Sequence, residues 1–494
     1  MYISQLMIRN FRNFDNAIFS FNKGVNSLIG ENGAGKTNAL FAIRLLIDTN
    51  LPIKAAQLIE TDFNRNLGDW RGHWIIIRLE FKDLAASEGT QMLSNYIEDM
   101  DTEEDKGTYN FHFMPTQKIR KDLYKLSEQI DKDKEKLKSI LDTITINDYE
   151  SVFCFRGSVD FTDEEIYRKY VGDFENIIFP NPEEESKEAL GEKTSQLHLI
   201  RNEISCTFIK ALRNVVNDLR NSKSSPLLNL LRGTSKDIQV ENFTEIMEMI
   251  KKLNKTICEL DEIGQLSEKI KKTLINTIGH TYAPNISIKS ELPEDINKLM
   301  QSLTLWVSDT EESGFESKLE DLSLGGANLL YITLKLLEYE FKQPKEEKAA
   351  HFLLIEEPEA HIHTHIQKTI FENYSFQNTQ VIISTHSTHI SSVNKISSIN
   401  ILCKENQRTN VCQPNNGLSD DECKRIERYL DAIRSTILFA KGVILVEGDA
   451  ELILIPALFK KVYGISLDEI GVSIINMSST VFKHICITFF RLSH

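Results

Sequence analysis

Ser27-Leu-Ile-Gly-Glu-Asn-Gly-Ala-Gly-Lys-Thr-Asn-Ala-Leu40 is a glycine-rich loop between an apolar run and a helix-forming run. Its glycines let backbone N–H groups converge on phosphate oxygens without a Cβ in the way. Lys36 can reach the β- and γ-phosphates, and the Thr37 hydroxyl can hold Mg²⁺. The N-terminal dipole of the following helix favours the same anion. This spacing predicts a phosphate-binding loop (P-loop) for ATP or GTP. The residues expected to contact the nucleotide are Gly30, Asn32, Gly33, Gly35, Lys36 and Thr37.

A glycine-rich turn that matches this pattern by chance is the alternative. The sequence context separates the two interpretations. Val25-Asn-Ser-Leu-Ile29 in front of the loop has the apolar character of a buried strand, and Ala39-Leu-Phe-Ala-Ile-Arg-Leu-Leu46 behind it is typical of a helix. Strand, loop and helix in this order favour nucleotide binding.

The composition is that of a soluble globular protein. The 494 residues are enough for about two to four domains, and 41% of them are hydrophobic and 26% charged. No window has the ~18 uninterrupted apolar residues of a membrane span, and the first ten residues do not resemble a signal peptide. The seven cysteines are scattered and form no CxxC pair, which argues against a disulfide framework or a zinc site. We therefore expect a cytoplasmic protein with no membrane partner.

The net charge of −15 argues against a protein that coats nucleic acid over its whole surface. A local basic groove remains compatible with this charge, because binding follows the patch and not the sum. The two basic clusters are Lys118 with Arg120 and Lys121, and the run Lys251-Lys-Leu-Asn-Lys255. Each of these two clusters is better explained as the solvated face of a helix than as a nucleic-acid-binding patch.

Patterning changes along the chain. Trp74–Phe81 is a strong strand signal near the end of a first region that carries the P-loop. The following region is polar and helix-rich, with helical segments expected at Asn202–Leu219 and Asn242–Leu253. Within it, Gln117–Asp142 has apolar residues at three-four spacing with a break near Asp133, which fits either a short coiled-coil arm or an ordinary surface helix. Regular patterning returns near residue 318.

A second set of residues is expected to complete the nucleotide site. His351-Phe-Leu-Leu-Ile-Glu-Glu-Pro-Glu-Ala-His361 is a buried strand with two glutamates where it ends. Glu356 suits the Mg²⁺ shell, and Glu357 suits a general base that positions water for attack on the γ-phosphate. A solvated acidic loop is the alternative, and the P-loop earlier in the chain favours the catalytic role.

Two further motifs fit the same site. Thr379-Gln-Val-Ile-Ile-Ser-Thr-His386 is another buried strand, and its histidine can contact the γ-phosphate and sense its loss, although a lone histidine is often structural. Leu322-Ser-Leu-Gly-Gly-Ala-Asn328 precedes an apolar helix, so Ser323, Gly325 and Gly326 form a second anion site at a helix N-terminus. Because the P-loop already holds its own phosphate, this second site is best explained as closing on the nucleotide of another protomer.

These four elements resemble, in content and order, the ABC-type ATPase heads of the RecF, SMC and OLD (overcoming lysogenization defect) proteins. The resemblance covers residues 1–85 and 318–400, with a helical insertion between them. It implies an ATP-sandwich homodimer in which the signature of one head caps the P-loop of the other. Ser323-Leu-Gly-Gly-Ala327 departs from the commoner Ser-Gly-Gly-Gln signature, so its detailed contacts are open. The glutamine of the family's Q-loop is not assigned.

The C-terminal region carries a separate motif. Gly442-Val-Ile-Leu-Val-Glu447-Gly-Asp-Ala-Glu451 resembles the opening of a Toprim domain, the metal-dependent module of topoisomerases, primases and OLD nucleases. Glu447 and Glu451, one helical turn apart, suit Mg²⁺ or Mn²⁺ and phosphodiester cleavage. The alternative is a strand followed by a solvated acidic turn. A second strand is expected at Gly471–Asn476 and a helix at Thr480–Leu492.

A head followed by this module is the OLD-family arrangement, and the chain is identified as a member of that family. The resemblance implies an ATP-dependent DNA endonuclease of the kind used against phage or in DNA processing. No Asp-x-Asp pair follows residue 451, so the Toprim domain is expected to be partial, to cleave DNA weakly or not at all, or to be completed by a second polypeptide. The main alternative is a RecF- or SMC-like ATP-switched DNA-binding protein without cleavage. A transporter ATPase subunit fits less well, because of the long stretch between Thr37 and Leu322.

The predicted fold class is therefore α/β: an ABC-type ATPase head with a helical insertion, followed by a partial α/β Toprim domain. The expected divisions are an N-terminal lobe with the P-loop (1–85), a helix-rich insertion that serves as a dimerisation arm (86–317), a C-terminal lobe (318–415), a linker helix (416–440) and the partial Toprim domain (441–494).

Overall fold

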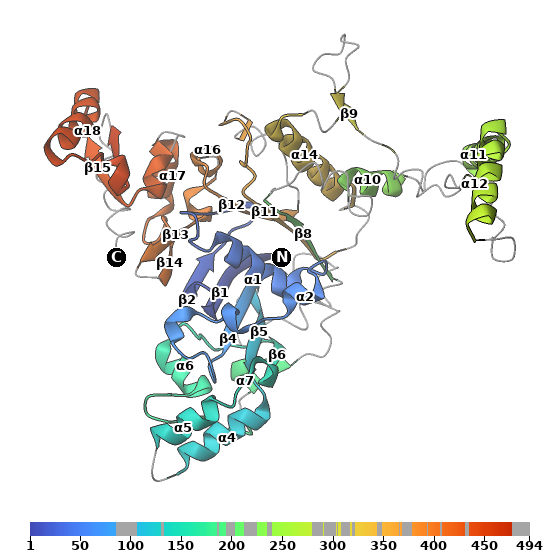
Figure 1. Cartoon of the computed structure of the whole chain (residues 1–494). Helices are drawn as coiled ribbons and strands as arrows, with labels where there is room; N and C mark the ends of the chain where they lie inside the picture. The colour runs from blue at the N-terminus through green and yellow to red at the C-terminus, as the bar shows by residue number, and fades with distance from the viewer. Residues whose placement is uncertain are drawn as a thin grey trace. The chain divides into compact units, whose positions relative to one another are not determined.

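The computed structural model describes residues 1–84, 106–129, 133–184, 187–193, 203–211, 225–234, 240–278, 290, 303, 305–307, 317–318, 322–342, 348–364, 366–367, 378–392, 394–405, 408–429 and 434–476 (Figure 1). The chain forms two compact units. One consists of Met1–Ala211 and Glu346–His494, and the other of Leu212–Lys345. Within the described part of the chain, no helix combines the length and the apolarity needed to span a bilayer.

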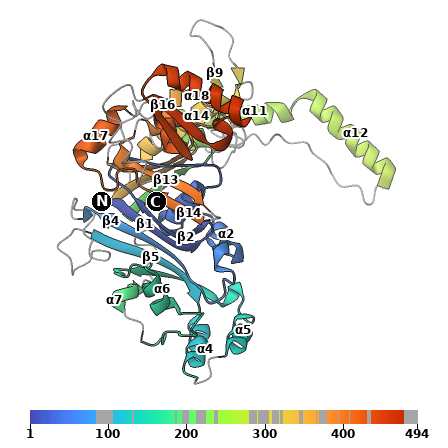
Figure 2. The same ribbon diagram turned by 90° about the vertical axis from the view of Figure 1, so that its left-hand side faces the viewer.

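The first unit contains an antiparallel sheet of six strands in the order β2-β1-β4-β5-β6-β7 (Figure 2). Its strands are β1 (Tyr2–Phe11), β2 (Phe14–Ser20), β4 (Ile75–Lys82), β5 (Lys106–Pro115), β6 (Tyr149–Phe155) and β7 (Glu192–Lys193). The strand predicted at Trp74–Phe81 is confirmed as β4. Nine of the ten residues of β5 are buried, polar ones included, so this strand lacks the alternation that sequence reasoning looks for.

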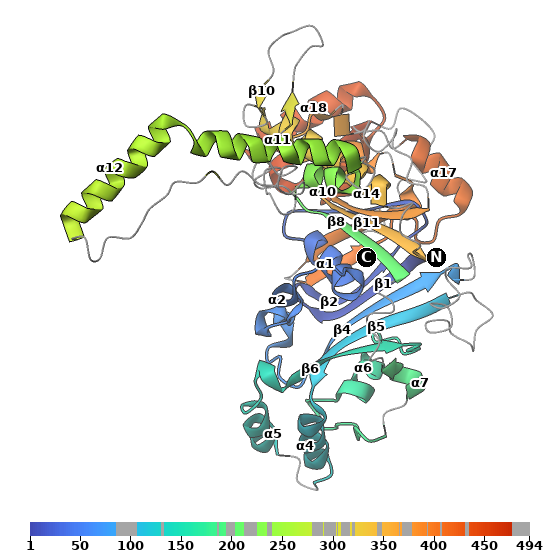
Figure 3. The same cartoon turned by 90° about the vertical axis from the view of Figure 1, so that its right-hand side faces the viewer.

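The second sheet of this unit carries the nucleotide-binding motifs. Its order is β14-β13-β3-β12-β11-β8, and every neighbouring pair is parallel except β13 with β14 (Figure 3). The strands are β3 (Val25–Gly30), β8 (Ile204–Ile209), β11 (Ala350–Glu356), β12 (Thr379–Thr385), β13 (Ile399–Glu405) and β14 (Arg408–Cys412). Because parallel strands end at the same edge of a sheet, the P-loop after β3, the glutamates after β11 and His386 after β12 meet at one edge.

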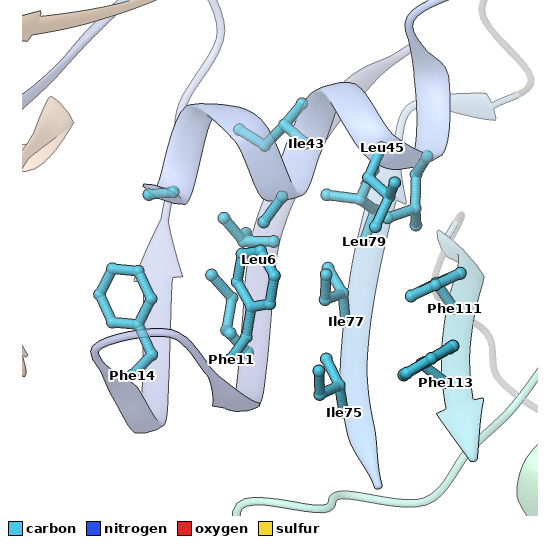
Figure 4. Packing of buried hydrophobic residues seen from close by; sticks show 14 of the residues in the cluster. Leu6, Phe11, Phe14, Ile43, Leu45, Ile75, Ile77, Leu79, Phe111 and Phe113 are labelled. Atoms are coloured by element: carbon cyan, nitrogen blue, oxygen red, sulfur yellow. The ribbon is translucent and has the colours of Figure 1, made fainter. Parts of the chain in front are cut away.

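Helix α1 (Lys36–Ile47) lies against the antiparallel sheet and fills the main core (Figure 4). Ile43 and Leu45 pack with Leu6, Ile77 and Phe111 in one buried cluster. Each such side chain contributes about 1.5–3 kcal/mol when fully buried. The same cluster includes Phe352 and Leu354 of β11, so the α1 side of the parallel sheet belongs to this core. Helix α1 therefore packs between the two sheets.

The remaining α-helices in the N-terminal part of this unit are α2 (Ile53–Ala56), α4 (Gln117–Ser127), α5 (Lys134–Leu141), α6 (Glu164–Val171) and α7 (Lys187–Leu190), with 3₁₀ turns at Glu60–Asp62, Arg65–Leu67 and Ile146–Asp148. The break predicted near Asp133 is confirmed, and Asp133 caps α5 by accepting a hydrogen bond from the Glu135 N–H. Leu123 and Leu137 of this pair are buried in the main core. The structure thus favours packed surface helices over a free arm. Arg120 is buried, so it does not belong to a solvated face.

The second unit is mainly helical. It contains α10 (Pro226–Thr234), α11 (Val240–Cys258), α12 (Asp261–Ile278) and α14 (Leu324–Lys342), with the short strands β9 (Trp306–Val307) and β10 (Ser317–Lys318) paired antiparallel. The Asn229 amide donates to the Glu338 carboxylate at 2.9 Å and ties α10 to α14. The helix predicted at Asn242–Leu253 is confirmed within α11.

The C-terminal part of the first unit contains α16 (Thr388–Ser391), α17 (Asp420–Tyr429), η10 (Arg434–Phe439), β15 (Gly442–Val446), α18 (Asp449–Tyr463) and β16 (Val472–Asn476), with 3₁₀ turns at Ile396–Ser398 and Asp468–Ile470. The two predicted strands are confirmed and pair in parallel. The helix predicted at Thr480–Leu492 lies outside the described residues. Ile29 of β3 shares a buried cluster with Ile437 and Ile475, so this part packs directly on the P-loop strand.

The observed units differ from the predicted divisions. The range 86–317 is not only a helical insertion, because β5, β6 and β7 extend the antiparallel sheet and β8 is an edge strand of the parallel sheet. The helix predicted at Asn202–Leu219 is wrong for Ile204–Ile209, which forms β8. Helix α14, placed by sequence in the C-terminal lobe, belongs to the second unit. In the predicted linker 416–440, α17 and η10 are separate helical segments.

Candidate nucleotide and metal site

The P-loop turns between β3 and α1 through three glycines with positive φ. Gly30, Gly33 and Gly35 have φ values of 151°, 76° and 106°. A Cβ on Gly30 would lie 2.4 Å from the Leu402 carbonyl oxygen, and one on Gly35 would lie 2.1 Å from the Asn13 amide nitrogen. Gly30 therefore requires glycine for space, because its neighbour is backbone, and both positions favour glycine for their backbone conformation. Helix α1 begins immediately afterwards at Lys36 and aims its N-terminus at the loop.

Lys36 is the buried cation of this loop. Its side chain is only 4% exposed, and its ammonium donates to the carbonyls of Gly30 at 2.8 Å and Glu31 at 3.0 Å. Burial lowers the pKa of Lys36 to about 8, opposed by the charges of Glu357 and Glu359. A desolvated ammonium surrounded by carbonyls and carboxylates favours an incoming polyanion, because its own hydration has already been lost.

Thr37 and Glu356 meet across the site. The Thr37 hydroxyl donates a hydrogen bond to one Glu356 carboxylate oxygen, and the Ala211 N–H donates to the other at 3.3 Å. A hydroxyl and a carboxylate in contact are two hard oxygen ligands, as Mg²⁺ prefers. These two residues therefore fit a metal ion that keeps its other positions for water and phosphate oxygens. Segments 319 residues apart in sequence meet here.

Glu357 and His386 face Lys36 from the ends of β11 and β12. The His386 Nδ1 lies 3.3 Å from the Lys36 ammonium, and its Nε2 lies 3.3 Å from a Glu357 carboxylate oxygen. Since Nδ1 faces a donor, the neutral ring carries its proton on Nε2, toward the carboxylate. Burial and the Lys36 charge lower the pKa of His386, which favours this neutral form. Glu357 has a φ of 43°, and its N–H donates to the Ser384 carbonyl at 2.9 Å.

Glu359 is a third carboxylate that sequence reasoning did not assign. It accepts a hydrogen bond from the His386 backbone N–H, and burial raises its pKa. The segment Glu357–Glu359 is thereby fixed to the end of β12. Burial thus favours the protonated form of this carboxyl more than solvent would. Its sequence signal was available, since it lies two residues after the predicted base.

A cavity of about 860 Å³ adjoins the P-loop on the side of Gly33. Polar side chains from four segments line it, among them Arg12, Asn38, Gln57, Asn64 and Lys404. A volume of this size exceeds what a triphosphate alone needs and is within the range of small-molecule sites. The cavity is therefore a candidate for the base and ribose of a nucleotide.

Arg12 is the most constrained group of this cavity. Its guanidinium donates to Asp62 at 2.8 Å and to the Asn38 side chain at 2.9 Å, and it lies 4.3 Å from the centre of the Phe41 ring. A fixed planar cation offers a stacking surface and hydrogen bonds to a base or ribose. Next to it, the Asn13 amide donates to the Ala34 carbonyl of the P-loop at 2.8 Å.

The second predicted anion site lies in the other unit. Ser323 precedes α14, and its hydroxyl accepts a hydrogen bond from the Gly326 N–H at 3.2 Å. Ser323 and Gly326 are exposed, and Gly325 is half-buried, so the first turn of this 19-residue helix is open to solvent. Free N–H groups at such a terminus attract phosphate.

The predicted Toprim carboxylates have a different setting. Glu447 follows β15, Glu451 lies in the first turn of α18, and both are exposed. The Asn476 amide at the end of β16 donates to Asp449 at 2.6 Å. Within the residues that the structure describes, no group of three or more His, Cys, Asp or Glu side chains is placed to hold a metal ion. Two carboxylates alone hold Mg²⁺ poorly.

The structure thus brings together the P-loop glycines, Lys36, Thr37, Glu356, Glu357 and His386 as the sequence predicted. It adds Arg12, Asn13 and Glu359, which were missed. A signal for the first two existed in the doublet Arg9-Asn-Phe-Arg-Asn-Phe14, a polar turn between two strands with positive φ at Asn10 and Arg12.

Two family models match the chain. Residues 1–391 match the AAA ATPase domain, and residues 438–493 match the Toprim domain of overcoming lysogenization defect protein-like proteins. Similar curated proteins include the Old nuclease of Escherichia phage P2, 24% identical over 54% of this chain and 48% of that protein. Endonuclease GajA of Bacillus cereus (strain VD045) is 22% identical over 98% of this chain and 72% of that protein. The chain spans about half the length of the phage relative.

Solved structures with a similar trace include an SMC head bound to the C-winged helix domain of ScpA. It is 14% identical, with a TM-score of 0.40, over 86% of this chain and 100% of that chain. The recombination mediator RecF-ATPrS is 14% identical, with a TM-score of 0.32, over 83% of this chain and 98% of that chain.

Proposed function

Because this chain belongs to the AAA ATPase domain family, we propose that it is an ATP- and Mg²⁺-dependent ATPase that acts on DNA. It also carries the Toprim domain of overcoming lysogenization defect (OLD) proteins. The single observation that carries the proposal is the contact between Thr37 and Glu356 beside the buried Lys36. It supports a triphosphate and its metal ion at the edge of the parallel sheet.

The proposed roles follow from the geometry. The P-loop N–H groups and Lys36 hold the phosphates, and Thr37 and Glu356 hold Mg²⁺, which neutralises charge that develops on the γ-phosphate. Glu357 accepts a proton from the attacking water, while His386 lies between this base and Lys36 and contacts the γ-phosphate. Arg12 and the adjoining cavity take the nucleoside.

DNA is the proposed substrate of the C-terminal module. The names of the two similar proteins, Old nuclease and Endonuclease GajA, support phosphodiester cleavage, with Glu447 and Glu451 as metal ligands for Mg²⁺ or Mn²⁺. Since these two carboxylates are not sufficient alone, DNA phosphate or a further polypeptide would supply the remaining ligands. A RecF- or SMC-like switch that binds DNA without cutting it is the second candidate, favoured by the exposed setting of Glu447.

A homodimer is the proposed assembly. The exposed first turn of α14, with Ser323, Gly325 and Gly326, would close on a γ-phosphate held by the P-loop of a second copy. Exposed apolar residues on α11, including Ile246, Met249 and Leu253 at three-four spacing, support a helix–helix contact in the same dimer.

Paired substitutions of the two glutamates test the ATPase. Glu357→Gln should slow ATP hydrolysis by about 10²–10⁴-fold while ATP still binds, because only the base is lost. Glu356→Gln should instead weaken the Mg²⁺-dependent part of ATP binding. Hydrolysis is followed by phosphate release and binding by fluorescence of a labelled ATP. Equal and small effects of both changes on turnover would overturn the proposed roles.

A further inference from the structure

Ser384 is a fully buried hydroxyl next to the proposed metal ligand. Its side chain is 0% exposed, and its Oγ has no hydrogen-bond partner among the described residues. Buried polar side chains are nearly always hydrogen-bonded, so an unpartnered hydroxyl at this place calls for a physical explanation. Nothing in the roles assigned above uses this group.

The strand register fixes where Ser384 lies. It pairs with Glu356 of β11 on one side and with Leu28 of β3 on the other. Residues that pair in register point to the same face of a sheet, and neighbouring strands lie about 4.8 Å apart. Leu28, Leu354 and Ile382 of these three strands belong to the core on the α1 side. By the alternation of side chains along each strand, Glu356 and Ser384 share that face.

Ser384 therefore stands between the strand that carries the P-loop and the strand that carries Glu356. Its backbone carbonyl already accepts the Glu357 N–H at 2.9 Å, so its main chain is fixed to the start of the catalytic segment. The hydroxyl is the group that remains. By strand register it belongs to the residue next to Glu356, whose carboxylate accepts from Thr37 and Ala211.

We propose that Ser384 is a positioning residue that donates a hydrogen bond to the Glu356 carboxylate when Thr37 ligates Mg²⁺. With its oxygen on the metal, the Thr37 hydroxyl would be reoriented, and its hydrogen bond to Glu356 would be weakened. A hydroxyl from the adjacent strand would then supply a donor that orients the Glu356 carboxylate toward the metal ion. Outer-shell partners of this kind typically change metal affinity about 10–100-fold. The inference rests on the proposed ATP and Mg²⁺ site.

The test compares Ser384→Ala with Ser435→Ala. Ser435 is a matched control, because its hydroxyl is also 0% exposed and unpartnered among the described residues but lies in η10. Binding of a fluorescent ATP analogue is measured with Mg²⁺ and with EDTA, and thermal unfolding is measured without nucleotide. Ser384→Cys, which keeps the volume and removes the strong donor, controls for a cavity left by alanine.

Ser384→Ala and Ser384→Cys should weaken analogue binding about tenfold in Mg²⁺ and leave it unchanged in EDTA. Both alanine variants should unfold at the wild-type temperature or a few degrees above it without nucleotide, because an unsatisfied hydroxyl has been removed. A Ser384→Ala protein that unfolds several degrees lower and keeps wild-type Mg²⁺ dependence would overturn the inference alone. A wild-type protein that binds no analogue under either condition would overturn the proposed function as well.

Discussion

The two predicted metal-binding pairs of glutamates lie at strand ends but have very different surroundings. Glu356 and Glu357 end a strand inside a six-stranded sheet, where a P-loop threonine, a histidine and backbone N–H groups contact them. Glu447 and Glu451 follow a strand of a two-stranded sheet and are exposed. The difference shows that a short acidic motif can form a binding site only if neighbouring strands place contacting side chains at the same edge of the sheet.

Removing the positive charge of Lys36 should impair the nucleotide site more than any other single change. Lys36→Met keeps the side-chain volume and removes the charge, so ATP hydrolysis should fall at least 100-fold. The nucleotide-free protein should become more stable, because the burial that lowers the pKa of Lys36 to about 8 opposes its charged form. Phosphate release and thermal unfolding measure the two effects.

Lys460→Met, on the exposed face of α18, is the matched control and should change neither quantity. A Lys36→Met protein that hydrolyses ATP at the wild-type rate would place the chemistry elsewhere.

The same lysine should make ATP binding sensitive to pH. Above pH 8 the free protein loses the Lys36 proton and must take it up again to hold the triphosphate. The apparent Kd for ATP should therefore rise toward tenfold per pH unit between pH 8 and 9.5, and should be flat between pH 7 and 7.5. Titrations of a fluorescent ATP analogue at fixed ionic strength measure this. A constant Kd up to pH 9.5 would contradict the low pKa.

The cavity beside the P-loop can be separated from the phosphate site. Arg12→Ala should weaken ATP binding about tenfold and leave inorganic tripolyphosphate binding nearly unchanged, because Arg12 lines the cavity and its guanidinium donates to Asp62 and Asn38 rather than facing Lys36. Calorimetric titration with both ligands measures the difference. Arg425→Ala, an exposed arginine of α17, is the control. Equal losses for the two ligands would show that Arg12 supports the whole site instead.

The smallest effect on the ATPase is expected from the second pair of glutamates. Glu447→Gln should leave ATP hydrolysis within about twofold of wild type, because its side chain is exposed and belongs to the other acidic motif. If the C-terminal module cleaves DNA, plasmid nicking in Mn²⁺ should be lost in the same variant. Wild-type nicking by Glu447→Gln would remove this residue from the metal site.

The nucleotide site was predictable because each of its parts lies at the end of a buried parallel strand. Leu353, Leu354 and Ile355 of β11 form a continuous apolar run, as strands buried on both faces do, and the polar residue that follows each run is then conspicuous. The P-loop, Glu356 and His386 all follow such runs, so the sequence supports both the strands and their shared edge.

The parts that were missed lack this signal. In β8 the apolar residues Phe208 and Ile209 lie four and five positions after Ile204, so the strict alternation of a half-buried strand is missing, and its pairing with β11 fixes it as a strand. Thr108, Asn110 and His112 of strand β5 are buried, so polar residues occupy core positions there. Burial of His112 lowers its pKa to about 4, so this polar residue is accommodated as a neutral ring.

The packing of Ile29 against Ile437 and Ile475 sets a limit on how the protein can be divided. A recombinant ATPase fragment cut after β14 would leave the far face of the P-loop strand and of β13 bare to water. Exposed apolar surfaces next to a sheet edge promote aggregation. An isolated head made this way should therefore be poorly soluble even with every catalytic side chain intact. Fragment boundaries for biochemical work belong after β16.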